Sequence, residues 1–378
     1  MPIDATCDGY RSLIEARREI DGRFTNLKFV GDGYSSLVFS ARDELERQNV
    51  AVKVFRPDRL SGDTYRYQCF CREATLLKQL VGTKNVLSLV AGRGEFVETL
   101  STPSGISIAL NFPFYVAELA QADVADLIRR NVWTAEEKLV NFREMCKSIQ
   151  RIHRMRIVHR DIKPGNFVLL PSGGLKIADF GTARDLGGDD PAIFLNYQYP
   201  PGDTRYAAPE MMALLHDGDP EIAFLGDIYS LGATLYELWS GTILGVQLFN
   251  PRFAMDLATT MNAVRKSERR RVYMQFVQNI SRGHSLPRLT PYGSLVPSSI
   301  WLLVDDLYRA MTALDFRERL ADFERIFLRL DQCLIVLRNE DKVCRWREQK
   351  RLRRLNRHEK DSSHHAVIDR FRLIGEIS

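Results

Sequence analysis

Two short polar segments, 159–166 and 179–181, constrain this chain more than any other part of its sequence. The first reads His-Arg-Asp-Ile-Lys-Pro-Gly-Asn and the second Asp-Phe-Gly. Between them, two apolar runs flank a turn at 171–174, which predicts a hairpin of two short strands. A hairpin brings its two ends together, so Asn166 and Asp179 should lie at the same end. An amide oxygen and a carboxylate suit Mg²⁺, which takes oxygen ligands and usually completes its shell with substrate phosphates and water.

A helix is predicted just before the first segment. Thr134 followed by Glu137 is a capping box, in which each side chain bonds the backbone N–H of the other residue, and apolar residues then recur at helical spacing. This helix should end near Arg156. The polar side chains of 159–166 are therefore expected on a loop between packed elements.

With these motifs the chain resembles the eukaryotic-like protein kinase superfamily, serine/threonine type, and the other motifs of that family follow in order. The resemblance implies an α+β, bilobal protein kinase fold. It has a small lobe of antiparallel β-sheet plus one helix (24–117), a larger mainly helical lobe (118–330), and ATP between them. An N-terminal extension (1–23) and a basic C-terminal helical tail (331–378) lie outside the resemblance.

Residues 31–38 resemble the glycine-rich loop of the family, whose backbone N–H groups approach the phosphates of ATP. Ser36 replaces the third glycine of that motif, and a lone G-x-G is weak support, so the strands predicted on either side give the match its weight. Lys53 resembles the lysine that positions the α- and β-phosphates. Glu73, on a predicted helix, resembles the ion-pair partner of that lysine; the alternative for Glu73 is a solvated charge on a helix face.

Residues 117–120 resemble the hinge between the lobes, whose backbone would hold the adenine. Ala117 falls at the position that guards the back of the pocket, and its small side chain predicts room for ATP analogues with bulky N6 substituents. Asp123 either reaches the ribose or is a charge in the first turn of a helix. The residues assigned to the nucleotide are Gly31, Asp32, Gly33, Tyr34, Ser35, Ser36, Val38, Ala51, Lys53, Ala117, Glu118, Ala120, Asp123 and Val168.

The resemblance also assigns the catalytic roles. Asp161 would orient the attacking hydroxyl, a kind of role that contributes about 10² to 10⁴ in rate, and Lys163 would offset charge on the transferred phosphoryl group. His159 is interpreted as a packing residue against Phe180 and not as the base. The predicted catalytic set is Asp161, Lys163, Lys53 and Glu73, and the predicted Mg²⁺ ligands are Asn166 and Asp179.

One position departs from the family pattern. Residues 204–210 resemble the end of the activation segment, and Glu210 is expected to pair with Arg319. The threonine that supports the catalytic aspartate is expected seven residues before Glu210, but Asp203 stands there. Either the loop is shifted by one residue, with Thr204 taking that place, or the support of a hydroxyl is lost.

Composition is that of a soluble globular protein: 378 residues, 45% hydrophobic and 27% charged, enough for two lobes. No run offers the roughly 18 uncharged apolar residues of a membrane span, and the first 22 residues lack the apolar core of a secretory signal. Six cysteines without C-x-x-C spacing indicate neither zinc nor a disulfide framework. The predicted location is the cytoplasm.

The net charge of +5 is concentrated near the C-terminus. Residues 338–360 hold ten Lys or Arg against four Asp or Glu, a net of +6. This run is either a solvated helix, a dock for an acidic protein, or a contact for nucleic acid or an anionic membrane. Trp346 is its only aromatic residue, so nucleic acid is the least favoured partner.

The predicted function is a serine/threonine protein kinase that uses ATP and Mg²⁺, acts on protein substrates and also phosphorylates itself. The alternative is a pseudokinase scaffold that binds nucleotide without efficient catalysis, supported only by Ser36 and Asp203. A small-molecule kinase such as an antibiotic or choline kinase is a third reading. The Ala-Pro-Glu segment at 208–210 argues against it, since those enzymes generally lack that segment.

Overall fold

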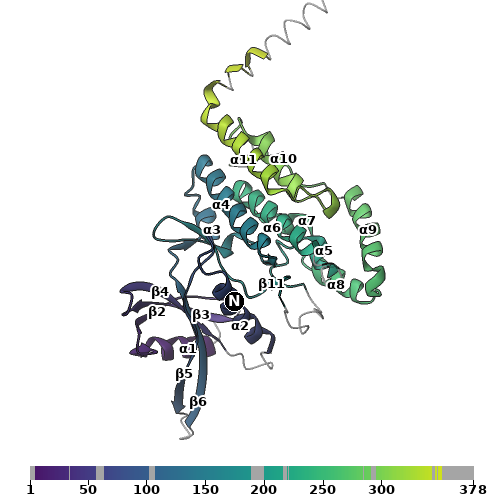
Figure 1. The fold of residues 1–378 in the computed structure, drawn as a ribbon. Coiled ribbons are helices and arrows are strands. Elements are labelled where there is room, and N and C mark those ends of the chain that lie inside the picture. Colours follow the sequence, from purple (N-terminus) through teal and green to yellow (C-terminus); the bar gives the residue numbers. More distant parts are fainter. Residues whose placement is uncertain are drawn as a thin grey trace, which may run out of the picture.

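The computed structural model describes residues 5–33, 35–56, 64–101, 107–188, 200–215, 219, 221–283, 285–290, 295–342, 345–346 and 348–350. Figure 1 shows a small lobe built on a β-sheet, in purple and dark blue, and a larger lobe of teal to yellow helices. The predicted bilobal α+β architecture is confirmed.

The small lobe contains an antiparallel six-stranded sheet in the order β1-β2-β3-β4-β6-β5. Its strands are β1 (Glu19–Ile20), β2 (Phe24–Asp32), β3 (Ser36–Asp43), β4 (Gln48–Phe55), β5 (Leu89–Ser101) and β6 (Ser107–Glu118). Val50, Val52 and Val54 of β4 are buried in one core. Because side chains alternate along a strand, Ala51 and Lys53 face the other way.

The N-terminal residues contribute to this lobe. Helix α1 (Ala5–Glu15) packs on β2, and the Glu15 carboxylate accepts a hydrogen bond from the Phe29 N–H at 2.7 Å. Ile14 and Ile20 are fully buried in the same core as the β4 valines. Residues 5–23, which the family pattern does not explain, therefore add one helix and one edge strand to the small lobe.

Helix α2 (Thr64–Gln79) is the helix expected within 24–117. Its Phe70 and Leu77, together with Leu80 just after the helix, belong to a second and larger core. Phe142, Phe167 and other large-lobe residues lie in that same core, so α2 couples the sheet to the large lobe.

The large lobe is built around two long helices, α4 (Ala135–Arg154) and α6 (Glu221–Ser240). The predicted capping box begins α4: Thr134 Oγ1 accepts from the Glu137 N–H at 3.3 Å, and Glu137 accepts from the Thr134 N–H at 2.8 Å. The other described helices are α3 (Val124–Arg130), α5 (Pro209–Met212), α7 (Leu244–Leu248), α8 (Phe253–Asn262), α9 (Lys266–Gly283), α10 (Trp301–Met311), α11 (Phe323–Arg338), η1 (Pro164–Asn166) and η4 (Phe316–Glu318).

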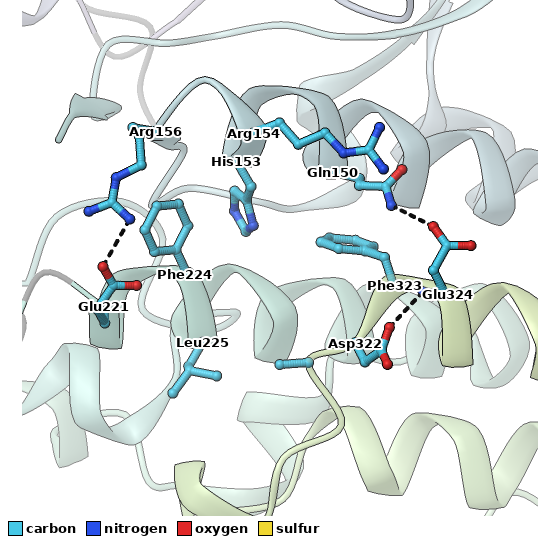
Figure 2. A pocket seen from close by; sticks show the side chains of 11 residues that line it. Gln150, His153, Arg154, Arg156, Glu221, Phe224, Leu225, Asp322, Phe323 and Glu324 are labelled. Carbon is cyan, nitrogen blue, oxygen red and sulfur yellow. Dashed lines mark hydrogen bonds and ion pairs between the residues drawn. The ribbon is translucent and has the colours of Figure 1, made fainter. Parts of the chain in front are cut away.

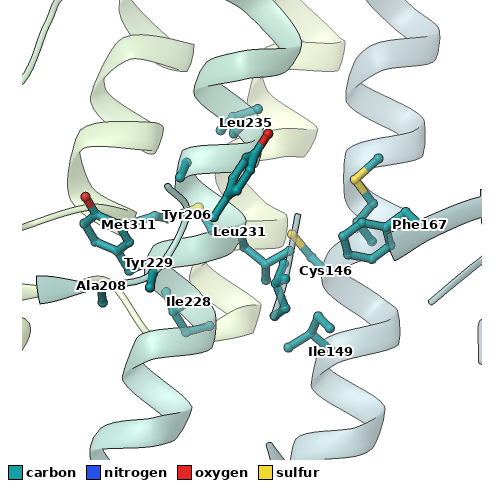
Figure 3. Packing of buried hydrophobic residues seen from close by; sticks show 14 of the residues in the cluster. Cys146, Ile149, Phe167, Tyr206, Ala208, Ile228, Tyr229, Leu231, Leu235 and Met311 are labelled. Atoms are coloured by element: carbon teal, nitrogen blue, oxygen red, sulfur yellow. The ribbon is translucent and has the colours of Figure 1, made fainter. Parts of the chain in front are cut away.

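Helix α6 is the buried centre of this lobe. Figure 3 shows Ile228, Leu231 and Leu235 of α6 packed beside Cys146 and Ile149 of α4. At Gly232 helix α10 comes close, because a Cβ there would lie 2.8 Å from Met311 Cβ and 2.6 Å from Thr312 Cγ2. A side chain at Gly232 would separate the two helices.

The predicted hairpin follows the loop at 159–166. Its strands β9 (Phe167–Leu169) and β10 (Leu175–Ile177) pair antiparallel, as predicted. A short strand β7 (Ala122–Asp123) extends this sheet, and β8 (Ile157–Val158) pairs with β11 (Arg184–Asp185) on the other side of the loop. These small pairings hold both ends of the polar loop against the large lobe.

Helix α11 leads into the predicted basic tail, of which residues from 351 onward lie outside the described part of the chain. The suggested acidic partner of that tail therefore stays a prediction. Among the described residues, no helix has both the length and the apolarity needed to cross a membrane.

Candidate active site

The polar loop is anchored to α6 through one carboxylate. Asp227 Oδ2 accepts a hydrogen bond from the His159 N–H and Oδ1 accepts one from the Arg160 N–H, both at 2.8 Å. Arg160 has a φ of 63°, in the left-handed region that costs energy for a residue with a side chain. The two bonds from Asp227 hold the loop in this conformation.

His159 is a structural residue, as expected. Its Nε2 lies 3.0 Å from the carbonyl oxygen of Ala178, and the Asp161 N–H donates to its Nδ1 at 3.3 Å. This pattern requires the neutral ring with the proton on Nε2. The ring meets the edge of Phe180 with centroids 5.0 Å apart, so both nitrogens and one face are occupied.

Asp161 is held by three donors. Its Oδ2 accepts from Lys163 Nζ at 2.9 Å and from Asn166 Nδ2 at 3.1 Å, and its Oδ1 accepts from the Asp203 N–H at 2.7 Å. Burial raises the pKa of Asp161 and the charge of Lys163 opposes that rise. The carboxylate is thus fixed in orientation beside a cation.

Asn166 and Asp179 converge as predicted. The Ala178 N–H donates to the Asn166 carbonyl oxygen at 2.8 Å, and Asn166 Nδ2 is used by Asp161, which leaves the amide Oδ1 of Asn166 as a spare acceptor. Burial raises the pKa of Asp179, but the charges of Lys53 and Lys163 and the Gly181 N–H are among the groups that together lower it below its ordinary value. One ionised carboxylate plus one amide oxygen is a donor set that fits Mg²⁺.

That metal would still depend on phosphate oxygens. Among the described residues, no cluster of three or more His, Cys, Asp or Glu side chains could hold an ion unaided. Two oxygen donors are fewer than Mg²⁺ takes, so an ion held by Asn166 and Asp179 would need further ligands such as phosphate oxygens.

Lys53 and Glu73 form a buried ion pair between β4 and α2. Lys53 Nζ lies 2.7 Å from Glu73 Oε2, and the Glu73 side chain is 3% exposed. Burial lowers the pKa of Lys53, but the charges of Glu73 and Asp179 outweigh it and raise the pKa above its ordinary value. Lys53 is therefore charged, and the alternative of a solvated charge for Glu73 is wrong because Glu73 is buried and paired.

The glycine-rich segment makes a tight turn between β2 and β3. The Gly33 N–H donates to the Ser36 carbonyl oxygen at 2.8 Å. Ser36 is fully buried, and its Oγ has no hydrogen-bond partner within the described part of the chain. An oxygen of the Asp32 carboxylate lies 3.6 Å from Nη1 of Arg56. Ser35 is half-buried, and Tyr34 falls outside the described residues.

The predicted hinge residues lie at the end of β6 and beyond it. Ala117 is buried directly opposite Ala51, and Val38 lies opposite Lys53. Glu118 accepts from the Ser88 N–H at 2.8 Å and from Lys176 Nζ at 2.6 Å. This last ion pair ties the hinge to β10 and was not predicted, because its residues lie 58 positions apart.

Two further nucleotide candidates lie just after the hinge. Asp123 is the N-cap of α3 and accepts from the Asp126 N–H at 2.8 Å, which confirms its role in the first turn of a helix. Val168 lies opposite Asp123 in the small sheet, and Ala120 is half-buried. A ribose contact by Asp123 stays a prediction.

The unusual Asp203 touches the site through its backbone. Gly202 has a φ of 80°, and a Cβ there would lie 2.3 Å from the Arg160 carbonyl oxygen. The Asp203 N–H reaches Asp161, while its carboxylate turns to Arg205 with contacts of 2.9 and 2.6 Å. The loop is therefore not shifted by one residue: Asp203 stands beside Asp161, and a main-chain N–H replaces the hydroxyl.

The expected pairing of Glu210 with Arg319 is confirmed. Both side chains are fully buried, and Arg319 donates to both carboxylate oxygens of Glu210. Arg319 also donates to the carbonyl oxygens of Ala313 and Leu225. This network attaches the end of the activation segment to the core of the large lobe.

A hollow with a volume of about 590 Å³ is lined by residues of α4, α6 and α11 and of the segments beside them. In Figure 2 His153 lies between Phe224 and Phe323. Its Nε2 is 2.8 Å from Asp227 Oδ2, the same oxygen that receives the His159 N–H. No local pattern predicts this contact, because His153 and Asp227 lie 74 positions apart.

Comparisons with known proteins agree with this geometry. A family model described as "Protein kinase domain" matches residues 24–319. A probable serine/threonine-protein kinase of Corynebacterium efficiens is 33% identical over 216 residues, which are 56% of this chain and 30% of that protein. A mitogen-activated protein kinase of Colletotrichum orbiculare is 29% identical over 321 residues, 82% of this chain and 78% of that protein.

A probable serine/threonine-protein kinase of Bifidobacterium longum is 30% identical over 222 residues, 58% of this chain and 30% of that protein. The match to each of these two bacterial kinases thus covers less than a third of that protein's length.

Proposed function

Because this chain belongs to the protein kinase family, we propose that it is a serine/threonine protein kinase that transfers the γ-phosphoryl group of ATP to protein hydroxyls, including its own. The observation that carries the proposal is the convergence of the Lys53–Glu73 ion pair, Asp161 and the Asn166–Asp179 pair on one site. The names of the bacterial relatives support serine and threonine as acceptors.

The roles follow from the geometry and from the family. Asp161 would accept a hydrogen bond from the acceptor hydroxyl and align its oxygen with the γ-phosphorus. Lys163, 2.9 Å from Asp161, would offset negative charge on the transferred group. Lys53, kept charged by Glu73, would hold the α- and β-phosphates. Most of the rate gain would come from positioning and charge stabilisation.

The nucleotide and metal sites complete the proposal. The turn at 31–36 would face the phosphates, with Ser36 buried within it, and the backbone at Ala117–Ala120 would hold the adenine. Asn166 and Asp179 would hold Mg²⁺, which, when bound, would neutralise negative charge on the phosphates of ATP.

The test is phosphate transfer from γ-labelled ATP with Mg²⁺ to the protein itself and to a basic generic acceptor, followed by analysis of the labelled amino acids. We expect label on serine or threonine, and a loss of about 10² to 10⁴ in rate for Asp161→Asn. Asp256→Asn, at an exposed position on α8, is the matched control and should retain full activity. ATP binding without any label would favour the scaffold reading instead.

A further inference from the structure

Strand β2 leads directly into the glycine-rich turn at 31–36 and has a largely open outer edge. In the described part of the chain, β1 is the one strand on that edge, and it pairs only with Phe24 and Thr25. The pairing of β2 with β3 also shifts register twice, the second time between Phe29 and Gly31. Bulges bend a strand and interrupt its ladder. The sheet alone therefore holds the end of β2 weakly, just where the turn begins.

Helix α1 packs on β2 and contacts Phe29 through two side chains. The Phe29 N–H donates a hydrogen bond to Glu15 Oε1 at 2.7 Å. The guanidinium of Arg11 lies over the Phe29 ring, 4.5 Å from its centroid, and Arg11 Nε is 3.5 Å from Glu15 Oε2. The same ring meets the ring of Phe39 on β3 edge-on, with centroids 5.7 Å apart. Both the backbone and the ring of Phe29 are thus held two residues before Gly31.

The position of Glu15 does not favour its own helix. Glu15 is the last residue of α1, and a negative charge at a helix C-terminus opposes the helix dipole. Its pair with Arg11 has the arginine first, which is the weaker orientation for residues four positions apart. Ile14, its neighbour, is fully buried in the small-lobe core and fixes the end of the helix. The carboxylate of Glu15 is therefore placed where its main benefit is to the backbone of β2.

We propose that Glu15 is a positioning residue that fixes the end of β2, and through it the glycine-rich turn, over the phosphates of the nucleotide. This inference rests on the proposed kinase function, which assigns that turn to the phosphates of ATP. The Gly33 N–H closes the turn on the Ser36 carbonyl oxygen, while Glu15 determines where the turn as a whole lies. The match to the family model begins at residue 24, so this support comes from outside the matched region.

The kinetic test compares Glu15→Ala with Glu15→Gln. Alanine removes the acceptor of the Phe29 N–H, whereas the amide oxygen of glutamine can still accept it. Glu15→Ala should raise the KM for ATP about three- to tenfold and change kcat less than about twofold, because contacts made equally in the ground and transition states affect KM alone. Glu15→Gln should bring the KM back to within about twofold of the wild type.

The matched control is Glu19→Ala. Glu19 is an exposed glutamate of the same N-terminal segment, and its pairing with Thr25 uses the backbone, which alanine keeps. This variant should have the wild-type KM for ATP. The inference is overturned if Glu15→Ala also has the wild-type KM, or if Glu15→Gln is as impaired as Glu15→Ala.

Nucleotide binding gives a readout that does not depend on phosphate transfer. The turn would face the phosphates and the hinge would hold the adenine, so Glu15→Ala should weaken ATP binding about three- to tenfold and leave adenosine binding unchanged. Calorimetric titration of the full chain measures both affinities. An equal loss for ATP and adenosine would reject the positioning role. If the wild type binds ATP but transfers no phosphate, the proposed function fails and this comparison still decides the role of Glu15; a wild type that binds no ATP overturns both.

Hydrogen exchange tests the contact itself. The Phe29 amide should exchange faster in Glu15→Ala than in the wild type, while the amides of β4 stay unchanged. An unchanged Phe29 amide would show that the bond to Glu15 does not hold β2 in solution. Faster exchange throughout β4 as well would indicate general loosening of the sheet, which also rejects the inference.

Discussion

At the scale of single residues, hydrogen bonds from backbone N–H groups hold important carboxylates of this site in place. Asp161 receives a main-chain N–H from Asp203, and Asp227 receives two from the catalytic loop. Because the donors are backbone N–H groups, these bonds fix where the donor residue lies but do not require a particular side chain on it. Asp203 can therefore replace a threonine while Asp161 keeps a donor at 2.7 Å.

Gly202 lies close to the loop at 159–166, so substitutions at Gly202 and at its neighbour Asp203 should lower kcat to different extents. Gly202→Ala should lower kcat by about 10², because a Cβ would collide with the Arg160 carbonyl oxygen and displace the loop. Asp203→Asn keeps the N–H and should lower kcat by a few-fold at most. Steady-state kinetics on both variants is the measurement, and an equal loss in the two would show that the carboxylate, not the amide, matters.

Ala117 predicts unusual tolerance toward modified ATP. It is buried opposite Ala51, so two small side chains face each other at the back of the expected adenine site. ATP analogues with bulky N6 groups should compete with ATP in the wild-type enzyme, and Ala117→Phe should abolish that competition while unmodified ATP still binds. Failure of such analogues to compete with the wild type would mean that Ala117 does not line the pocket.

At the scale of elements, features that depend on nearby residues were predicted from the sequence, and contacts between distant residues were not. The capping box of α4 and the β9–β10 hairpin depend on residues a few positions apart, and both formed as expected. The Lys176–Glu118 ion pair joins residues 58 positions apart, so no local pattern predicts it. Helix α1 was not predicted to be part of the small lobe, because it packs on β2 and that contact exists only once the sheet has folded.

The turn between β3 and β4 should make stability depend on pH. Asp43 accepts from Arg23 at 2.8 and 2.7 Å and from the Leu45 N–H at 3.1 Å. The hydrogen bonds from Arg23 lower the pKa of Asp43. A lowered folded-state pKa means that the stabilisation is complete above the unfolded value of about 3.9 and is lost as pH falls through the folded value.

Asp43→Asn should therefore lower the unfolding free energy by about 1 kcal/mol at neutral pH. The difference from the wild type should stay constant between pH 7 and about pH 5 and narrow below about pH 4. Urea unfolding at several pH values measures both quantities. A gap that widened toward low pH would contradict the assigned role of the carboxylate.

At the scale of the whole molecule, one buried ion pair joins the activation segment to the large-lobe core. Arg319→Ala should cost about 3–5 kcal/mol of stability, because it leaves the Glu210 charge buried without its partner. Arg317→Ala, two residues away, removes an exposed pair with Asp315 and should leave the unfolding free energy nearly unchanged. Denaturant unfolding of both variants tests the contrast, and similar losses would refute it.

The strand order of the small lobe has a consequence for synthesis on the ribosome. Its strands pair mostly with sequence neighbours, and all of them lie within residues 19–118. Pairings between neighbouring strands form quickly, and domains tend to fold as units from the N-terminus. We expect the sheet to be assembled while the large lobe is still being translated. Lys53 would then be in place before Asp161 and Asp179 leave the ribosome, so the site would be completed by its C-terminal half.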